Sequence, residues 1–553
     1  MAEIRRPESP TLFIPERSRQ EWGIAFLLFA FSVLILWPFQ DFTILFFDEG
    51  IILEGAQRVL RGQVLYRDFF TFYTPGSYYW TALRFKIFGS TLFAGRVILL
   101  VYGGIFSVVL YMLARRVCSR GIAVLTAYLF LVIGLPYRFL VLHNWDSSVL
   151  AVLALYAAVR WTESPRPAWG LTTGTLVSLT GFFEQSKGVG LVVGVGMGFL
   201  LIAWYARHPS LFSRTNLVAL LAGMTWPAVI IFVYFAAQNS LYPMLEDWLW
   251  PLRNYSLANR IPYAYLPLSF EAWETLYGSG SVLRRLFFIS LTSPFFIVPF
   301  LPVLALALLI HVTYRMRRET FSSATNSYYI LVCACSIGLV MGTVATGRPD
   351  ADHLLYVSPP LLLLVGWVLE GRLVPSSLLA RVQPLLVVFF LITFTTFGMI
   401  FLVSGPLSAR QKLQTRRGPI KLPCCDAVIP YLEGHIPPGE KIFVYPYQPL
   451  YYFLTDTRSP TKFDYLQLGM HTPEQMAQAI ADLETQGTAT VVYAPVFNSS
   501  VIIQAWPSTP QEMLNTDRVR DFIFSRYRPC KTLPSTDWWF VFMRRRDLPC
   551  PAG

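Results

Sequence analysis

The sequence WGIAFLLFAFSVLILWPFQDFTILFFDEG, from Trp22 to Gly50, joins a long apolar run to a pair of acidic residues. Its first part, up to Phe39, is apolar and long enough to cross a bilayer as a helix. A charged segment precedes this run and no small-residue cleavage site follows it, so we expect a retained membrane helix rather than a cleaved signal. Two adjacent carboxylates, Asp48 and Glu49, come just after it. Carboxylates at the edge of a membrane are costly unless they are solvated or used, so this pair is the first candidate for chemistry.

The composition is that of an integral membrane protein. Of 553 residues, 54% are hydrophobic and only 14% are charged, whereas soluble domains carry about 25% charged residues. The formal net charge is +12. Most Arg residues lie in short stretches between apolar runs, where they set membrane topology, so we expect the lipid bilayer as a partner and no nucleic acid.

Apolar runs recur along the first 404 residues and predict about eleven transmembrane helices. The expected spans lie near residues 22–40, 96–114, 121–139, 147–161, 169–183, 188–205, 217–237, 286–311, 327–345, 354–369 and 384–404.

The distribution of Arg predicts the orientation of these spans. Many Arg residues lie in the N-terminal segment and in every second connection between the expected spans. They are Arg5, Arg6, Arg17, Arg19, Arg115, Arg116, Arg120, Arg160, Arg166, Arg207, Arg214, Arg315, Arg317, Arg318, Arg372 and Arg381. Placing them in the cytoplasm satisfies the positive-inside tendency and puts the N-terminus inside. An odd number of spans then places the C-terminal segment outside the membrane.

The expected fold class is an α-helical polytopic membrane protein with a C-terminal extracytoplasmic α/β domain. Residues 1–404 form the membrane domain, whose first outer loop, 41–95, is predicted to hold two helices in the interface plane, near 50–60 and 78–88. A second long outer loop covers 238–285. Residues 405–553 form the α/β domain, with strands at 441–445, 488–493 and 538–543 and a helix at 473–487. One or two disulfides are expected among its four cysteines if that side is oxidising. These are Cys424, Cys425, Cys530 and Cys550.

The first outer loop carries an ordered series of motifs. The Asp-Glu pair is followed by Gly55-Ala56, by Gly62-Gln63-Val64-Leu65-Tyr66, by Pro75-Gly76 and by Phe88-Gly89, before Arg96 opens the next span. This series resembles the first outer loop of the GT-C superfamily of membrane glycosyltransferases. Within it, the chain is similar to the dolichyl-phosphate-mannose protein mannosyltransferase and bacterial aminoarabinose transferase families. The likeness is specific over residues 47–96 and rests on topology elsewhere.

The resemblance implies transfer of a sugar from a polyprenyl-phosphate donor to an acceptor on the outer face of the membrane. Asp48 then is the general base that takes the acceptor's proton, and Glu49 supports it. Direct proton acceptance implies inversion by a single displacement. The acceptor stays open among glycolipid, polysaccharide and protein. A bacterial inner (plasma) membrane is the expected location.

Further polar residues are candidates for the same site. Asp146 in the next outer loop either orients the acceptor or sugar, or caps a helix. Lys187 and Arg348 are cations at the outer ends of spans, suited to the lipid phosphate that leaves, or else interfacial side chains that reach for water. In the aminoarabinose branch a Lys precedes the Pro of the first loop, and this chain has Thr74 there. The remaining candidate substrate-binding residues are Tyr66, Arg67, His143 and His353.

Two other interpretations were weighed. Asp350-Ala351-Asp352 spells a DxD pattern, whose carboxylates suit Mg²⁺ or Mn²⁺, but a monophosphate lipid donor needs no metal, so no metal site and no cofactor are expected. A transporter or flippase of lipid-linked saccharides is the alternative function. It predicts internal repeats and ionisable residues near mid-span, whereas the ionisable residues here gather at one edge of the membrane.

Overall fold

The computed structural model describes residues 13–45, 47–205, 211–254, 260–265, 292–316, 323–371, 377–536 and 538–551. Some predictions fall outside these residues. They concern the outer loop beyond 265, the start of the span expected at 286–311, and Arg5, Arg6, Arg207, Arg317, Arg318 and Arg372.

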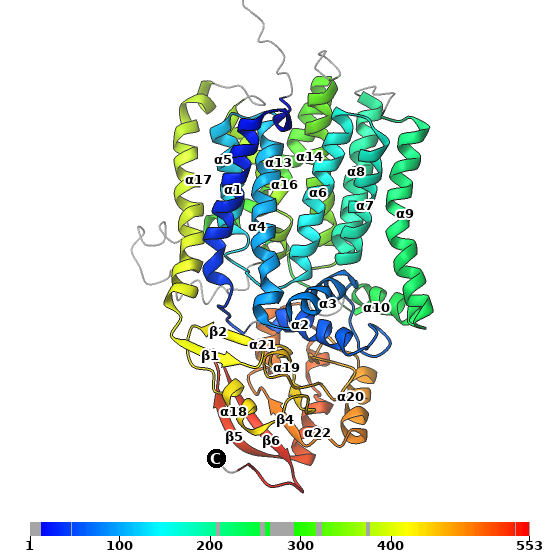
Figure 1. Cartoon of the computed structure of the whole chain (residues 1–553), viewed down its shortest axis with the longest axis vertical. Coiled ribbons are helices and arrows are strands. Elements are labelled where there is room, and N and C mark those ends of the chain that lie inside the picture. Colours follow the sequence, from blue (N-terminus) through cyan, green and yellow to red (C-terminus); the bar gives the residue numbers. More distant parts are fainter. Residues whose placement is uncertain are drawn as a thin grey trace, which may run out of the picture.

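The membrane part is a bundle of helices that run side by side (Figure 1). These helices are α1 (Arg19–Leu36), α4 (Leu92–Arg115), α5 (Arg120–Ile133), α6 (His143–Glu163), α7 (Pro167–Phe183), α8 (Gln185–Tyr205), α9 (Arg214–Ala237), α13 (Ser293–Met316), α14 (Ser323–Ala345), α16 (Pro359–Glu370) and α17 (Ser377–Ser404). Among the described residues, seven helices are long and apolar enough to cross a membrane. The polytopic helical fold is thereby confirmed, while the total of eleven spans stays a prediction.

Each expected span coincides with a helix, with one difference of form. The span expected near 354–369 is divided between α15 (Ala351–Tyr356) and α16. Pro359 and Pro360 lie at the start of α16, where they suit the first turn of a helix but cannot continue a preceding one. The division leaves the short helix α15 directly after the polar residues 347–350.

Small residues let α8 and α14 pack with their backbones in contact. A Cβ atom on Gly190 would lie 2.4 Å from the carbonyl oxygen of Gly338, and one on Gly338 would lie 2.2 Å from that of Gly190. Close backbone approach through glycine is typical of membrane helix pairs. This contact fixes the position of α8, and with it the position of Lys187 in its first turn.

The first outer loop lies between the bundle and the C-terminal part (Figure 1). It contains α2 (Phe47–Leu60) and α3 (Gly76–Phe88), at the positions predicted for two helices, and α10 (Leu241–Asn254) lies beside them. A Cβ atom on Gly50 would lie 2.1 Å from the backbone nitrogen of Leu450. Only glycine therefore fits where α2 meets α19 (Leu450–Leu454) of the C-terminal part.

The C-terminal part combines a hairpin, a mixed sheet and helices. The hairpin pairs β1 (Gln411–Thr415) with β2 (Gly418–Leu422), and the sheet has the order β3 (Phe443–Tyr445), β4 (Thr490–Tyr493), β6 (Trp539–Arg545), β5 (Tyr527–Pro534). The β3–β4 pair is parallel and the others are antiparallel. Its helices besides α19 are α18 (Val428–His435), α20 (Pro473–Thr485), α21 (Ser499–Ala505) and α22 (Arg518–Arg526). The three predicted strands and the predicted helix are present as β3, β4, β6 and α20.

Two features of the C-terminal part bear on its environment and attachment. Cys530 and Cys550 form a disulfide, whereas Cys424 and Cys425 are not disulfide-bonded in the described structure. Buried apolar side chains of the first outer loop and of the C-terminal part form one continuous core. Phe85 of α3, for example, stacks on Phe453 of α19 with ring centroids 5.4 Å apart. The C-terminal part is therefore packed onto the loop that carries the Asp-Glu pair.

Candidate active site

Asp48 lies in the first turn of α2, where the bundle, the first loop and the C-terminal part meet. Its side chain is half-buried, and the hydroxyl of Tyr447 donates a 2.7 Å hydrogen bond to its Oδ1. Burial raises the pKa of Tyr447 well above the usual value of a phenol. Tyr447 thus keeps its proton and acts as the donor in this bond. Among the residues that the structure describes, no Lys, Arg or His forms an ion pair with Asp48.

Glu49 is engaged differently from its neighbour. It is fully buried and forms two hydrogen bonds with Arg96, of 2.8 and 2.5 Å, while the backbone N–H of Val141 donates a third, of 3.0 Å. Arg96 also donates to the carbonyl oxygens of Phe39 and Phe42. The pair ties α2 to α4 and to the end of α1, so Glu49 holds the turn from which Asp48 projects.

Asp146 joins three helices at the same end of the bundle. It is buried and accepts 2.6 Å hydrogen bonds from the hydroxyls of Ser77 and Tyr102. Because α6 begins at His143, Asp146 lies within the first turn and does not cap the helix. Its carboxylate holds α3 against α4 and α6.

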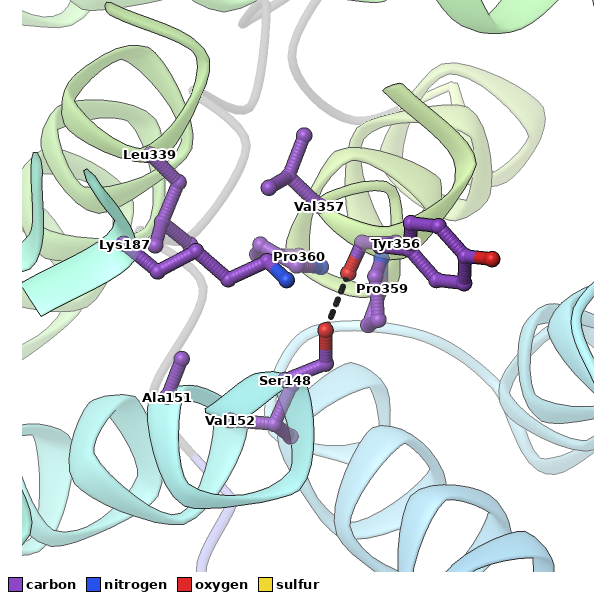
Figure 2. A pocket seen from close by; sticks show the side chains of 9 residues that line it. All are labelled: Ser148, Ala151, Val152, Lys187, Leu339, Tyr356, Val357, Pro359 and Pro360. Carbon is purple, nitrogen blue, oxygen red and sulfur yellow. Dashed lines mark hydrogen bonds between the residues drawn. The ribbon is translucent and has the colours of Figure 1, made fainter. Parts of the chain in front are cut away.

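Lys187 is buried in a compact polar cluster. Its Nζ donates to Glu184 at 2.6 Å and to the carbonyl oxygen of Asn144 and the hydroxyl of Ser147 at 3.1 Å each. It also lies 5.4 Å from the ring centroid of Tyr356. Figure 2 shows Lys187 and Tyr356 on the wall of a cavity of 10 Å³, the space of about one water molecule.

The loop 347–353 places its charged residues in two separate groups. Asp350 accepts hydrogen bonds from the backbone N–H and the Nδ1 of His353, at 2.9 and 2.7 Å, and lies 3.6 Å from the Nε of Arg348. Burial opposes ionisation, yet His353 and Arg348 lower the pKa of Asp350 to about 2. Asp352 instead pairs with Arg138 at 2.7 Å and accepts a hydrogen bond from Tyr137.

The two carboxylates of the DxD pattern therefore face different partners. Within the described ranges, no group of three or more His, Cys, Asp or Glu side chains is arranged to hold a metal ion.

The remaining candidates have distinct positions. Tyr66 is buried at a positive φ of 70°, donates to the carbonyl oxygen of Tyr73 and accepts from Trp248. Its hydroxyl is thus used to shape the first loop. Arg67 is exposed and pairs with Asp68. The ring of His143 packs 4.1 Å from that of Tyr73.

The structure brings several predicted residues together around Tyr356. Its hydroxyl interacts electrostatically with Asp48, Arg138 and both carboxylates of the DxD pattern, and its ring contacts Lys187. His143 in turn interacts electrostatically with Glu184, Lys187 and His353. Asp48, His143, Lys187, Arg348 and His353 therefore gather at one end of the bundle, whereas Arg67 lies on the surface and Tyr66 in the loop core.

Sequence reasoning missed Tyr447, Tyr356 and Arg138. Tyr447 lies in the segment YPYQP, residues 445–449. An aromatic, proline-rich turn directly after a predicted strand is a recognisable signal, but the sequence contains nothing that links it to Asp48, 399 residues away.

Comparison with solved structures identifies membrane proteins of similar fold. ArnT from Cupriavidus metallidurans in the apo state aligns with a TM-score of 0.52 and 13% identity, over 95% of this chain and 98% of that chain. The same protein bound to undecaprenyl phosphate aligns with a TM-score of 0.47 and 13% identity, over 95% and 97% of the two chains. The oligosaccharyltransferase AglB from Archaeoglobus fulgidus, in complex with an inhibitory peptide and a dolichol-phosphate, aligns with a TM-score of 0.47 and 10% identity, over 97% and 76%. The fold assignment rests on the first of these.

The family model of the dolichyl-phosphate-mannose-protein mannosyltransferases matches residues 73–232. This segment runs from the first outer loop into α9. No curated protein matches the sequence. The predicted resemblance to membrane glycosyltransferases is thereby confirmed, over a segment that begins after the Asp-Glu pair.

Proposed function

We propose that the protein transfers a sugar from a polyprenyl-phosphate-linked donor to an acceptor, with Asp48 as the general base. The observation that carries the proposal is the environment of Asp48. It is half-buried at the junction of bundle and C-terminal part, and its hydrogen bond comes from a neutral phenol. A general base must be able to take a proton, which a carboxylate locked in a buried Arg pair does poorly.

The proposed reaction is a single displacement. The acceptor oxygen or nitrogen forms a bond to the anomeric carbon of the sugar, the bond from that carbon to the phosphate oxygen breaks, and Asp48 takes the proton of the acceptor. One displacement inverts the anomeric configuration. The polyprenyl phosphate leaves with negative charge, which fixed cations stabilise. Lys187 and Arg348 are the cations that we assign to this role.

Two sets of findings support the proposal. The matched family is named for a mannosyl donor linked to dolichyl phosphate, and the apo ArnT fold extends over nearly the whole chain. The donor sugar is accordingly proposed to be a hexose or a pentose. Glycolipid, polysaccharide and protein are all retained as acceptor classes.

The proposed location is a bacterial inner membrane, with the N-terminus in the cytoplasm and the C-terminal part outside. The Arg-rich connections around α1 and α4 lie at the end of the bundle opposite the C-terminal part (Figure 1), as positive-inside orientation requires. The disulfide between Cys530 and Cys550 also suits an oxidising compartment.

The test is transfer of labelled sugar from a polyprenyl-phosphate donor by the purified protein in lipid nanodiscs, with a cell-envelope fraction as acceptor. Asp48→Asn should lower the rate by about 10²- to 10⁴-fold, the usual contribution of a general base, while the thermal unfolding midpoint stays unchanged. The matched control is Asp41→Asn in the same loop, whose carboxylate forms a partly exposed pair with Lys421. Near-normal transfer by Asp48→Asn would rule out the base assignment.

A further inference from the structure

A second, larger cleft lies between the first loop and the C-terminal part. It has a volume of 480 Å³, within the range of about 300–1,000 Å³ typical of ligand sites. Glu54 and Arg58 of α2 lie four residues apart on one helix face, and together with Arg61, which directly follows the helix, they form one wall. Asp48 precedes Glu54 by six residues on the same helix. At about 100° per residue, its side chain points roughly 120° away from that of Glu54 around the helix axis. The cleft is thus separate from the proposed catalytic site.

The charge of the cleft favours an anionic ligand. Five cationic side chains line it, against the three carboxylates of Glu54, Asp68 and Asp482. Those cations are Arg58, Arg61, Lys441, Arg458 and Lys462. Arg58 is held by Asp464 at 2.5 Å. Arg458, in contrast, is exposed and makes no side-chain hydrogen bond or ion pair within the described part of the chain.

Glu54 points to hydroxyl groups in the ligand. Its side chain is fully buried, and Oε1 accepts a 2.8 Å hydrogen bond from Arg61. Its Oε2, which is also buried, has no hydrogen-bond partner in the described structure. A buried carboxylate oxygen without a donor is costly, so a ligand hydroxyl that donates to it gains a strong hydrogen bond.

The rest of the lining suits a sugar better than an acidic peptide. Amide and hydroxyl side chains fill the space between the charges, from Gln63, Ser459, Thr461, Gln478 and Gln486, and Pro460 is the only apolar side chain among the lining residues that the structure describes. Peptide-binding surfaces rely on apolar or aromatic anchors. A polyhydroxylated ligand instead uses many separate donors and acceptors.

We propose that this cleft binds an anionic saccharide, with Lys441 and Arg458 contacting its phosphate or carboxylate groups and Glu54 accepting a hydrogen bond from a hydroxyl. Such binding does not depend on the catalytic role of Asp48. The cleft lies where α2, the helix that carries Asp48, contacts the C-terminal part. A ligand bound there therefore connects the C-terminal part to the first loop.

The test is isothermal titration of the full-length protein in detergent with defined probes. Trigalacturonate and glucose 6-phosphate should bind saturably and more weakly as salt increases, whereas maltotriose, which is neutral, should bind at least tenfold more weakly. The double variant Lys441→Ala, Arg458→Ala should lose at least tenfold in affinity for both anionic sugars. Lys412→Ala, which removes an exposed cation from β1, is the matched control and should bind normally.

Separate outcomes overturn the proposal. Inorganic phosphate or hexa-aspartate binding as tightly as the anionic sugars would show a general anion or peptide site. Unchanged binding by the double variant, with an unchanged unfolding midpoint, would place the sugars elsewhere. Glu54→Gln should weaken binding of both sugars, and equal affinity would exclude the hydroxyl contact. Because binding is measured without transfer, an inactive Asp48→Asn protein should still bind normally.

Discussion

The carboxylates at the two ends of the helix bundle have different hydrogen-bond partners. At the end away from the C-terminal part, Glu163 pairs with Arg116, which is fully buried and also pairs with Glu16. At the other end, Glu49 pairs with the buried Arg96, but the adjacent Asp48 accepts its hydrogen bond from the hydroxyl of Tyr447. Buried Arg pairs thus secure the helices at both ends. Asp48 and Asp146, whose hydrogen bonds come from hydroxyl groups, both lie at the end that carries the proposed chemistry.

Breaking one Arg pair at each end separates architecture from chemistry. Arg96→Met leaves the buried Glu49 without a cation and should lower the free energy of unfolding by about 3–5 kcal/mol. Arg116→Met should cost less, because Glu163 keeps its pair with Arg160 at 2.8 Å. Chemical denaturation in detergent measures this loss. At a temperature where both variants remain folded, Arg96→Met should also lose transfer activity, because Glu49 no longer fixes the turn that carries Asp48. Equal specific activities of the two variants would contradict the positioning role of Glu49.

The second prediction concerns the hydrogen bond from Tyr447 to Asp48. Tyr447→Phe deletes a hydrogen bond to a carboxylate, which is worth about 1.5–3 kcal/mol. Because the phenol holds the carboxylate of Asp48 in one orientation, its loss should lower the kcat of transfer about tenfold and leave KM nearly unchanged.

A matched control for this variant lies in the C-terminal sheet. Tyr445 donates a 2.6 Å hydrogen bond to Asp517, so Tyr445→Phe removes the same kind of contact away from Asp48. It should leave the kcat of transfer unchanged. A decrease of equal size in both variants would mean that the effect comes through overall stability.

The third prediction concerns the junction between the first loop and the C-terminal part. His471 is buried among Phe70, Trp250 and Phe463, and burial lowers the pKa of His471 to about 3. Below about pH 6.5 the unfolded chain binds a proton that the folded chain excludes, so stability is full above that pH and falls as the pH decreases.

The size of this effect follows from the same linkage. Between pH 7.5 and 5.5 the free energy of unfolding should decrease by about 1.4 kcal/mol through His471, and His471→Leu should remove that part of the decrease. Thermal unfolding of both proteins across this range measures it. If the stability of the two proteins changed with pH in the same way, the pKa of His471 would have to be the same in the folded and the unfolded chain.

Much of the scaffold could be predicted, because length and hydropathy determine where spans and amphipathic helices lie. β5 was missed because its sequence, YRPCKTLP, lacks apolar alternation and carries two prolines, which a sheet tolerates at an edge such as β5 occupies.

The contacts of the candidate site were largely beyond sequence reasoning. Glu49 and Arg96 both belong to the loop motif, but their pairing appears only once α2 lies against α4. The contact of Tyr447 with Asp48 depends on the C-terminal part folding back onto the first loop. Such long-range contacts leave no periodic signal in a single sequence.

The most direct test of the account is an electron-density map of the protein with a non-transferable phosphonate analogue of a polyprenyl-phosphate sugar. We expect the sugar beside Asp48, with the phosphonate next to Lys187 or Arg348. An analogue bound at the Arg-rich end of the bundle, or with its sugar out of reach of Asp48, would contradict the proposed function.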